Sequence, residues 1–316
     1  MFEPTDTPRL FALPPGVDFP GELIRGLTDR MAGQSPLAMA QVDLVVNTRR
    51  MARRLRDLFD TGPARLLPRI SLVTDVVETW LPGALPPSAP PLRRRLELAQ
   101  LVARLIKAQP DLAARHSVYD LADSLADLLD EMQGEGVSAE TIRTLDVTDM
   151  SGHWARAQSF IGIVETYLDE QSGQLDPQAR QRRAVQTLIE QWAATPPEHP
   201  VILAGSTGSR GTTHMLIDAV ARLPQGAVVL PGFDFDQPGG IWADMSDARV
   251  SEDHPQFRFS PILQGLDLQP GDVRRWTNSA PASEPRNRLV SLALRRFAPL
   301  VRCSRHTGRT SHIFNI

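Results

Sequence analysis

Four short apolar runs place the strongest constraint on how this chain folds. Each run is short, apolar or β-branched, and bounded by Pro, Gly or Asn, which is typical of a buried strand. Apolar residues at helical spacing follow these runs, and alternation of strands with helices predicts a parallel sheet covered on both faces. The sequence therefore predicts an α/β fold with strands at Leu10–Leu13, Val42–Val46, Val201–Ala204 and Ala227–Leu230.

The middle of the chain has a different pattern. A proline-rich break spans Leu81–Pro91, helical patterns continue to Ala194, and a second break follows at Thr195–Pro197. One predicted amphipathic helix carries its apolar stripe at the helical period, with aspartates around the other side. The stripe predicts burial of Val118, Leu121, Leu125, Leu128, Leu129 and Met132.

These breaks divide the chain into four predicted segments. Residues 1–85 and 198–296 form the two parts of an α/β core, and residues 86–197 form an all-α insertion between them. Residues 297–316 form a basic tail whose apolar residues show no clear helical or strand period. The part of the chain after Glu284 holds seven arginines and no acidic residue, and we expect either a functional arm or a truncated or frame-shifted end.

Composition limits the classes of function. The formal net charge of -3 gives no overall attraction to nucleic acid or membranes, so any nucleic-acid surface has to be local. Cys303 is the single cysteine, which excludes an internal disulfide and fits a reducing compartment. No apolar run approaches the ~20 residues that cross a bilayer, and the acidic, proline-broken N-terminus is not a secretory signal. We expect a cytoplasmic protein.

The turn after the first predicted strand argues against ATP hydrolysis. A nucleotide-binding turn cradles phosphates with backbone N–H groups and neutralises their charge with a lysine. Here Pro14 and Pro15 remove two donors, Asp18 adds a repelling charge, and the sole lysine, Lys107, lies in a distant predicted helix. We therefore expect no ATP turnover at this turn.

A glycine-rich loop follows the predicted strand at Val201–Ala204. Its backbone and side chains have the chemistry to hold a phosphate at a helix start, and they equally suit an ordinary turn whose hydroxyls cap the helix. The loop does not match the G-x-S-x-G nucleophile elbow, which excludes that hydrolase class. The candidate phosphate-binding residues are Gly205, Ser206, Thr207, Gly208, Ser209 and Arg210.

A helix dense in arginine follows the second predicted strand. Thr48 is placed to cap it, and Met51, Leu55, Leu58 and Phe59 form its apolar face. Five guanidinium groups on the remaining arc suit contacts with a phosphate backbone, although a solvated face paired with acidic neighbours has the same composition. The candidate DNA-binding residues are Thr48, Arg49, Arg50, Arg53, Arg54 and Arg56.

The remaining polar clusters favour no catalytic or metal site. Asp234 and Asp236 have the chemistry of a divalent-metal site of a sugar-nucleotide transferase, but aspartates are common in such Pro-Gly-rich turns, and we favour the turn. Glu252–His254 reads as a surface loop. Cys303, His306 and His312 fit no zinc spacing.

Several stretches, in this order along the chain, resemble a known family. The chain is similar over roughly residues 8–295 to the AddB subunit of the AddAB helicase–nucleases, in its alphaproteobacterial form. The stretches are Phe11–Phe19 (FALPPGVDF), Val46–Arg56 (VNTRRMARRLR), Pro91–Ala99 (PLRRRLELA), Tyr119–Leu125 (YDLADSL), Asp130–Gly136 (DEMQGEG), Ala204–Gly211 (AGSTGSRG) and Leu230–Asp236 (LPGFDFD).

The resemblance implies a function in processing broken DNA ends for homologous recombination. It implies a P-loop-NTPase-like core of the superfamily 1 helicase type whose ATP site has decayed, with a helical insertion. Arg49–Arg56 correspond to the first DNA-contacting loop and helix of such a core, and Gly205–Gly211 to its acidic metal-binding motif, here without acids. The implied partners are single-stranded or duplex-end DNA and an AddA-type helicase–nuclease subunit.

The resemblance implies no catalytic residue, metal or cofactor in this chain. The family's nuclease domain and iron–sulfur cysteines lie further along than these residues, and the similarity ends after about Arg296. Two other classes of function stay open from the residues alone. One is a metal-dependent sugar-nucleotide transferase that uses Asp234 and Asp236, and the other is a scaffold that binds only a protein partner.

Overall fold

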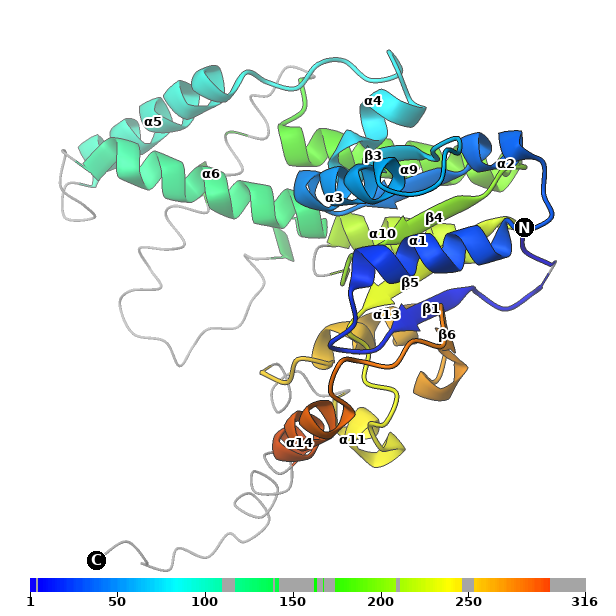
Figure 1. Cartoon of the computed structure of the whole chain (residues 1–316). Helices are drawn as coiled ribbons and strands as arrows, with labels where there is room; N and C mark the ends of the chain where they lie inside the picture. Colours follow the sequence, from blue (N-terminus) through cyan, green and yellow to red (C-terminus); the bar gives the residue numbers. More distant parts are fainter. Residues whose placement is uncertain are drawn as a thin grey trace, which may run out of the picture. The chain divides into compact units, whose positions relative to one another are not determined.

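The computed structural model describes residues 1–3, 5–109, 117–138, 140–141, 162–163, 167, 174–208, 211–245 and 253–295 (Figure 1). These residues divide into two compact units. The first unit comprises the described residues within Met1–Val73, Trp192–Ser209 and Leu216–Ile316, and the second comprises those within Thr74–Gln191 and Arg210–Met215. The expected tail at 297–316, with Cys303, His306 and His312, lies outside the described residues, as do Ser209 and Arg210.

The first unit is built on a parallel sheet. Within the described residues the sheet has six strands in the order β3-β2-β4-β5-β1-β6. This confirms the predicted α/β class with its parallel sheet. The strands are β1 (Leu10–Leu13), β2 (Asp43–Val46), β3 (Arg69–Leu72), β4 (Val201–Ala204), β5 (Gly226–Pro231) and β6 (Arg274–Arg275).

The four predicted strands are present, with small differences at their ends. β1 and β4 have the predicted bounds, β2 begins one residue later, and β5 is one residue longer at each end. All four residues of β1, β2 and β4 are buried, as expected for strands covered on both faces. β3 and β6 lie at the two edges of the sheet and were not predicted.

Two helices cover one face of this sheet. α1 (Phe19–Arg30) and α3 (Arg49–Asp60) contact each other over the strands (Figure 1). Because side chains alternate along a strand, every second residue faces these helices. Phe11 and Leu13 of β1 therefore share a core with Leu23 and Leu27 of α1. On the strands, Leu10, Ala12, Leu203 and Val228 are also buried, so the other face is covered too.

The second unit contains a pair of long helices. α5 (Pro91–Ala108) packs against α6 (Val118–Glu135), and their apolar residues form a separate core. Leu125 is 4% exposed, as predicted, but Leu128 is 37% exposed, so the prediction that Leu128 is buried is wrong. Asp123 faces outward and forms an ion pair with Arg95 at 2.7 Å.

A buried polar cluster joins α5 and α6 to the residue before α9 (Pro177–Ala194). Asp176 is fully buried, and Tyr167 Oη donates a hydrogen bond to its Oδ1 at 2.9 Å. Gln133 Nε2 donates to Asp176 Oδ2 at 3.1 Å, and Arg94 lies within ion-pair distance of Asp176 and Asp130. Buried carboxylates need such partners, because an unpaired buried charge is strongly destabilising.

The remaining elements complete the described part of the chain. They connect the strands and helices above, and α14 ends the described residues. They are α2 (Pro36–Gln41), η1 (Val73–Asp75), α4 (Val76–Trp80), α10 (Gly211–Arg222), α11 (Gly239–Asp244), η3 (Phe257–Phe259), α13 (Ser260–Gly265), η4 (Pro270–Asp272) and α14 (Glu284–Arg295).

Candidate nucleic-acid interface

The connections that leave the carboxyl ends of two neighbouring strands, β2 and β4, lead in opposite directions along the sheet. The strands are in register, with Val46 opposite Ala204. From β2 the chain passes through α3 to β3 at one edge of the sheet, whereas from β4 it passes toward β5 on the other side. Open α/β sheets commonly bind ligands at such a point, where the connections lead away in opposite directions.

Both loops at this point are fixed by close packing. Gly205 has φ +77°, a conformation that favours glycine. A Cβ atom on Gly205 would lie 3.3 Å from Cε1 of Phe19 and 3.6 Å from Oδ1 of Asn47. The backbone of Gly205, directly after β4, therefore packs against the side chain of Asn47, directly after β2.

α3 begins at this edge with a capped first turn. Thr48 Oγ1 accepts a hydrogen bond from the Met51 N–H at 3.1 Å, which confirms the predicted N-cap. Ala52, Leu55 and Phe59 are buried against the sheet. The predicted apolar face is thus correct at Leu55 and Phe59 and at Met51, which is partly buried against the same core, and Ala52 is added to it. This packing determines which side of the helix faces outward.

The outward side of α3 is a row of arginines. Arg49, Arg50, Arg53, Arg54 and Arg56 are all exposed. Within the described residues, no carboxylate lies within ion-pair distance of any of the five, and only Arg56 has a hydrogen bond, donated to the Ile70 carbonyl at 3.3 Å. The ion pairs that a solvated face with acidic neighbours would form are therefore absent among these residues. The row is a strip of five positive charges along one helix, and the exposed Asp57 and Asp60 of the same helix are not within ion-pair distance of it.

The glycine-rich loop beside α3 is less open to an anion. Ser206 is buried, and its Oγ accepts a hydrogen bond from the Gly208 N–H at 3.3 Å. At the start of α10, the Gly211 N–H donates to Glu135 Oε1 at 2.8 Å. A helix N-terminus attracts negative charge, and this carboxylate already supplies it. A phosphate at this helix start would have to displace Glu135.

The turn after β1 is also occupied by the chain itself. Gly16 has φ +79°, and Nδ2 of Asn287 in α14 donates a hydrogen bond to the Pro15 carbonyl at 2.6 Å. A Cβ atom on Gly16 would lie 3.1 Å from the same nitrogen. In place of a lysine that would neutralise phosphates, an uncharged amide fills this turn. The expectation that the turn does not serve ATP hydrolysis stays a prediction.

The two aspartates after β5 are arranged as a turn. Asp234 Oδ1 accepts a hydrogen bond from the Asp236 N–H at 3.0 Å, and Oδ2 accepts one from Ser291 Oγ at 2.5 Å. These bonds are those of an aspartate that stabilises its own loop. Among the described residues, no group of three or more His, Cys, Asp or Glu side chains is placed to hold a metal ion.

Two long-range contacts, one within each unit, were not predicted from the sequence. Glu135 meets Gly211 across 76 positions of the chain, and Asn287 meets Pro15 across 272. Neither pair belongs to a local motif, so only the folded backbone reveals it. Nothing in the sequence around either residue signals the contact.

Comparisons with known proteins add no family. Neither a scan against protein-family models nor a search of curated proteins found a significant match to the chain. Within the described residues, no helix is both long and apolar enough to cross a membrane. The interpretation of the interface therefore depends on its own geometry and charge.

Proposed function

We propose that α3 binds the sugar–phosphate backbone of single-stranded DNA. The observation that carries this proposal is the strip of five exposed arginines, which begins where the chain diverges between β2 and β4. Guanidinium groups bind phosphate oxygens in a bidentate manner, and phosphate contacts supply most of the affinity for nucleic acid without reading sequence. The capped, packed helix holds the arginines on a rigid surface.

The same proposal extends to the role of the whole chain. The chain acts as an AddB-like DNA double-strand-break repair subunit, with a decayed, P-loop-NTPase-like core of the superfamily 1 helicase type and an all-α insertion. It works in the cytoplasm with an AddA-type helicase–nuclease subunit, on DNA ends processed for homologous recombination. The proposal assigns no catalytic residue, metal or cofactor to this chain. Its support is the stretches of similarity, the parallel sheet and the amide-filled turn after β1.

Charge reversal on α3 tests the DNA-binding proposal. We expect Arg50→Glu with Arg53→Glu to weaken binding of single-stranded oligonucleotides about equally across sequences. The slope of log affinity against log salt should flatten by about 1.4, at about 0.7 for each phosphate of a single strand that the variant no longer neutralises. Fluorescence anisotropy at several salt concentrations measures both quantities.

A matched variant separates a local effect from a change in net charge. Arg286 and Arg288 are exposed on α14 and lie two positions apart. Arg286→Glu with Arg288→Glu changes the net charge by the same amount and should leave the slope nearly unchanged. If both double variants lose affinity equally, or if neither does, α3 is not the binding surface. If the unaltered chain does not bind DNA, the result favours the alternative of a scaffold that binds only a protein partner.

The transferase alternative has less support. Both carboxylate oxygens of Asp234 already accept hydrogen bonds from Asp236 and Ser291. A metal at this position would have to replace these partners. Isothermal titration with a nucleotide sugar, with and without a divalent metal, distinguishes the alternatives, because only a transferase site would give saturable heat that depends on the metal.

A further inference from the structure

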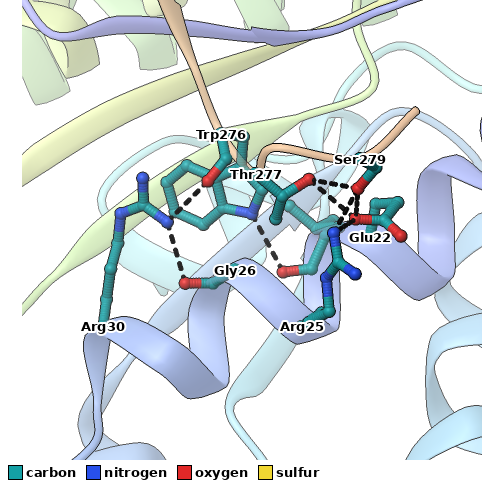
Figure 2. A network of polar contacts seen from close by, with 8 residues as sticks. Glu22, Arg25, Gly26, Arg30, Trp276, Thr277 and Ser279 are labelled. Carbon is teal, nitrogen blue, oxygen red and sulfur yellow. Dashed lines mark hydrogen bonds and ion pairs between the residues drawn. The ribbon is translucent and has the colours of Figure 1, made fainter.

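A hollow of ≈520 Å³ lies between α1 and the edge strand β6 with the turn that follows it. Its lining includes Arg25 and Arg30 of α1, and Arg275, Trp276, Thr277 and Asn278 from β6 and the following turn. Figure 2 shows how the α1 side chains and the turn after β6 meet. We call this hollow the α1–β6 pocket. It lies within the first unit and includes no residue of α3.

The wall of the pocket is rigid. Trp276 is 2% exposed, and its Nε1 donates a hydrogen bond to the Leu23 carbonyl at 3.1 Å. The Arg30 guanidinium carbon lies 3.8 Å from the centre of the Trp276 ring, and Nη1 donates to the carbonyls of Gly26 and Trp276, each at 2.9 Å (Figure 2). Arg30 is thus held in place before any ligand arrives.

Positive charge predominates around this wall. Arg25 is exposed and forms an ion pair with Glu22 at 2.6 Å, and Arg275 is exposed above the Phe235 ring. Asp29 also lines the pocket, but among the described residues no ion pair joins it to an arginine. Three arginines line the pocket and two carboxylates lie near them. Glu22 is the ion-pair partner of Arg25, which also donates a hydrogen bond to Ser279 Oγ, so a phosphate would take over Arg25 from these two partners.

The nearby arginines also act on one another. Burial lowers the pKa of Arg30, Asp29 raises it, and the positive charge of Arg274 lowers it again. Arg274 does not line the pocket, but its charge adds to the positive potential at Arg30, and a positive potential attracts an anion.

We propose that the α1–β6 pocket binds a phosphate group. Guanidinium groups match the oxygens of phosphate better than other cations do, because their donors form a planar fork. Arg25 and Arg275 are the exposed groups that would close on the phosphate, while Arg30 supplies fixed positive charge behind them. The phosphate belongs either to a phosphorylated small molecule or to a nucleic-acid backbone, and both present the same chemistry to the pocket.

The test measures two probes on the whole chain and on two variants. The probes are inorganic tripolyphosphate, followed by isothermal titration, and a single-stranded oligonucleotide, followed by anisotropy. Arg25→Gln with Arg275→Gln removes the exposed guanidinium groups and keeps Arg30, which supports Trp276. Arg286→Gln with Arg288→Gln on α14 removes the same charge away from the pocket. Circular dichroism confirms that each variant is folded.

We expect the pocket variant to lose about tenfold or more in affinity for at least one probe, since hydrogen bonds between charged groups are the strong ones. Loss for tripolyphosphate identifies a phosphorylated small molecule, and loss for the oligonucleotide alone identifies a nucleic-acid backbone. The α14 variant should keep its affinity for both. Unchanged affinity in the pocket variant, or an equal loss in the α14 variant, overturns the proposal.

The pocket proposal can fail or succeed independently of the proposal that α3 binds DNA. The Arg50→Glu and Arg53→Glu variant leaves the pocket intact, so its tripolyphosphate binding should equal that of the unaltered chain. Loss of tripolyphosphate binding in that variant would place the phosphate on α3 instead of in the pocket.

Discussion

At the scale of single residues, Gly26 determines how closely α1 approaches the edge of the sheet. A Cβ atom at this position would lie 2.4 Å from Nε1 of Trp276 and 2.9 Å from Cγ2 of Thr277. Trp276 has no room to yield, because its ring is covered by Arg30 and its Nε1 is bonded to the Leu23 carbonyl. A glycine in a helix ordinarily costs stability, so close packing is the physical reason that favours one here.

We therefore expect Gly26→Ala to destabilise the protein by about 1–3 kcal/mol through overpacking, which exceeds the ~0.5–1 kcal/mol gained from alanine in a helix. Urea unfolding followed by circular dichroism measures the change. Gly240 in α11 is the control, because no atom lies within 4 Å of a Cβ there. Gly240→Ala should be neutral or stabilise by about 0.5 kcal/mol. Equal effects in both variants would contradict the packing argument.

His254 gives the fold a dependence on pH. Burial lowers the pKa of His254 from its ordinary value of 6.5, and Asp234 partly opposes this shift. The Gln256 N–H donates a hydrogen bond to Nδ1 of His254 at 3.1 Å, so the neutral ring is the form that the fold accepts. A proton on Nδ1 would remove this acceptor.

Because the pKa is lower in the folded state, the unfolded state binds the proton more readily below pH 6.5. The contribution of neutral His254 to stability is present above pH 6.5, and it is lost as the pH falls through the pKa of His254 in the folded state. We expect the urea midpoint to fall further between pH 7.5 and pH 5.5 in the unaltered protein than in His254→Gln. The same fall in both would show that other groups account for the dependence.

At the scale of elements, helices with a clear stripe were easier to predict than edge strands. The stripe on α6 correctly placed Leu125 and Met132 in the core. It misplaced Leu128, because a period of 3.6 residues sets only the centre of a face, and the partner helix decides how wide the buried face is. Only the packing of α5 against α6 supplies that width.

This difference predicts unequal costs for two neighbouring leucines. Leu125→Ala should cost about 2–5 kcal/mol, because it removes a side chain from the core shared by α5 and α6. Leu128→Ala should cost less, about 1 kcal/mol, because this residue is 37% exposed whereas Leu125 is 4% exposed. Thermal or urea unfolding of the two variants, side by side, measures the contrast. Similar losses would mean that Leu128 is buried in solution.

The two missed strands lack the signal that revealed the other four. β6 is two arginines, both exposed, and it becomes a strand only because it pairs with β1. β3 begins with an exposed arginine and is buried at one end only. Edge strands are short and charged in natural sheets, so apolar runs do not identify them. β6 also lines the α1–β6 pocket, so that pocket was not predictable from motifs.

At the scale of the whole molecule, the candidate interface was partly predictable. Thr48 and the arginines of α3 form one local segment, and a cap with an amphipathic period places them correctly. The position of the glycine loop beside α3 depends on the order of strands, which local sequence does not specify. Glu135 binds the start of α10 at Gly211, and Asn287 binds the turn after β1 at Pro15. Both partners come from distant parts of the chain, so the sequence did not predict that they occupy these two candidate phosphate-binding turns.

Exposed connections that contain proline and glycine predict where a protease cuts first. Pro82, Gly83 and Ala84 are exposed near the start of the second unit, and a Cβ at Gly83 would meet no atom within 4 Å. We expect the earliest cleavage by proteinase K in the 82–91 segment or at 196–198, mapped by mass spectrometry. The 118–132 segment should stay intact, because α6 is packed against α5. Early cuts there would contradict the helical core.

The arginine strip on α3 also determines which chemical modifications can reach the interface. Acylating reagents and acetyltransferases act on amines, and Lys107 of α5 is the only lysine in the chain. Lysine acetylation, which weakens many DNA-binding surfaces, therefore cannot neutralise the candidate interface on α3. Lys107 is exposed, and an amine-reactive dye directed to it would report on the protein while leaving every guanidinium group of α3 unmodified.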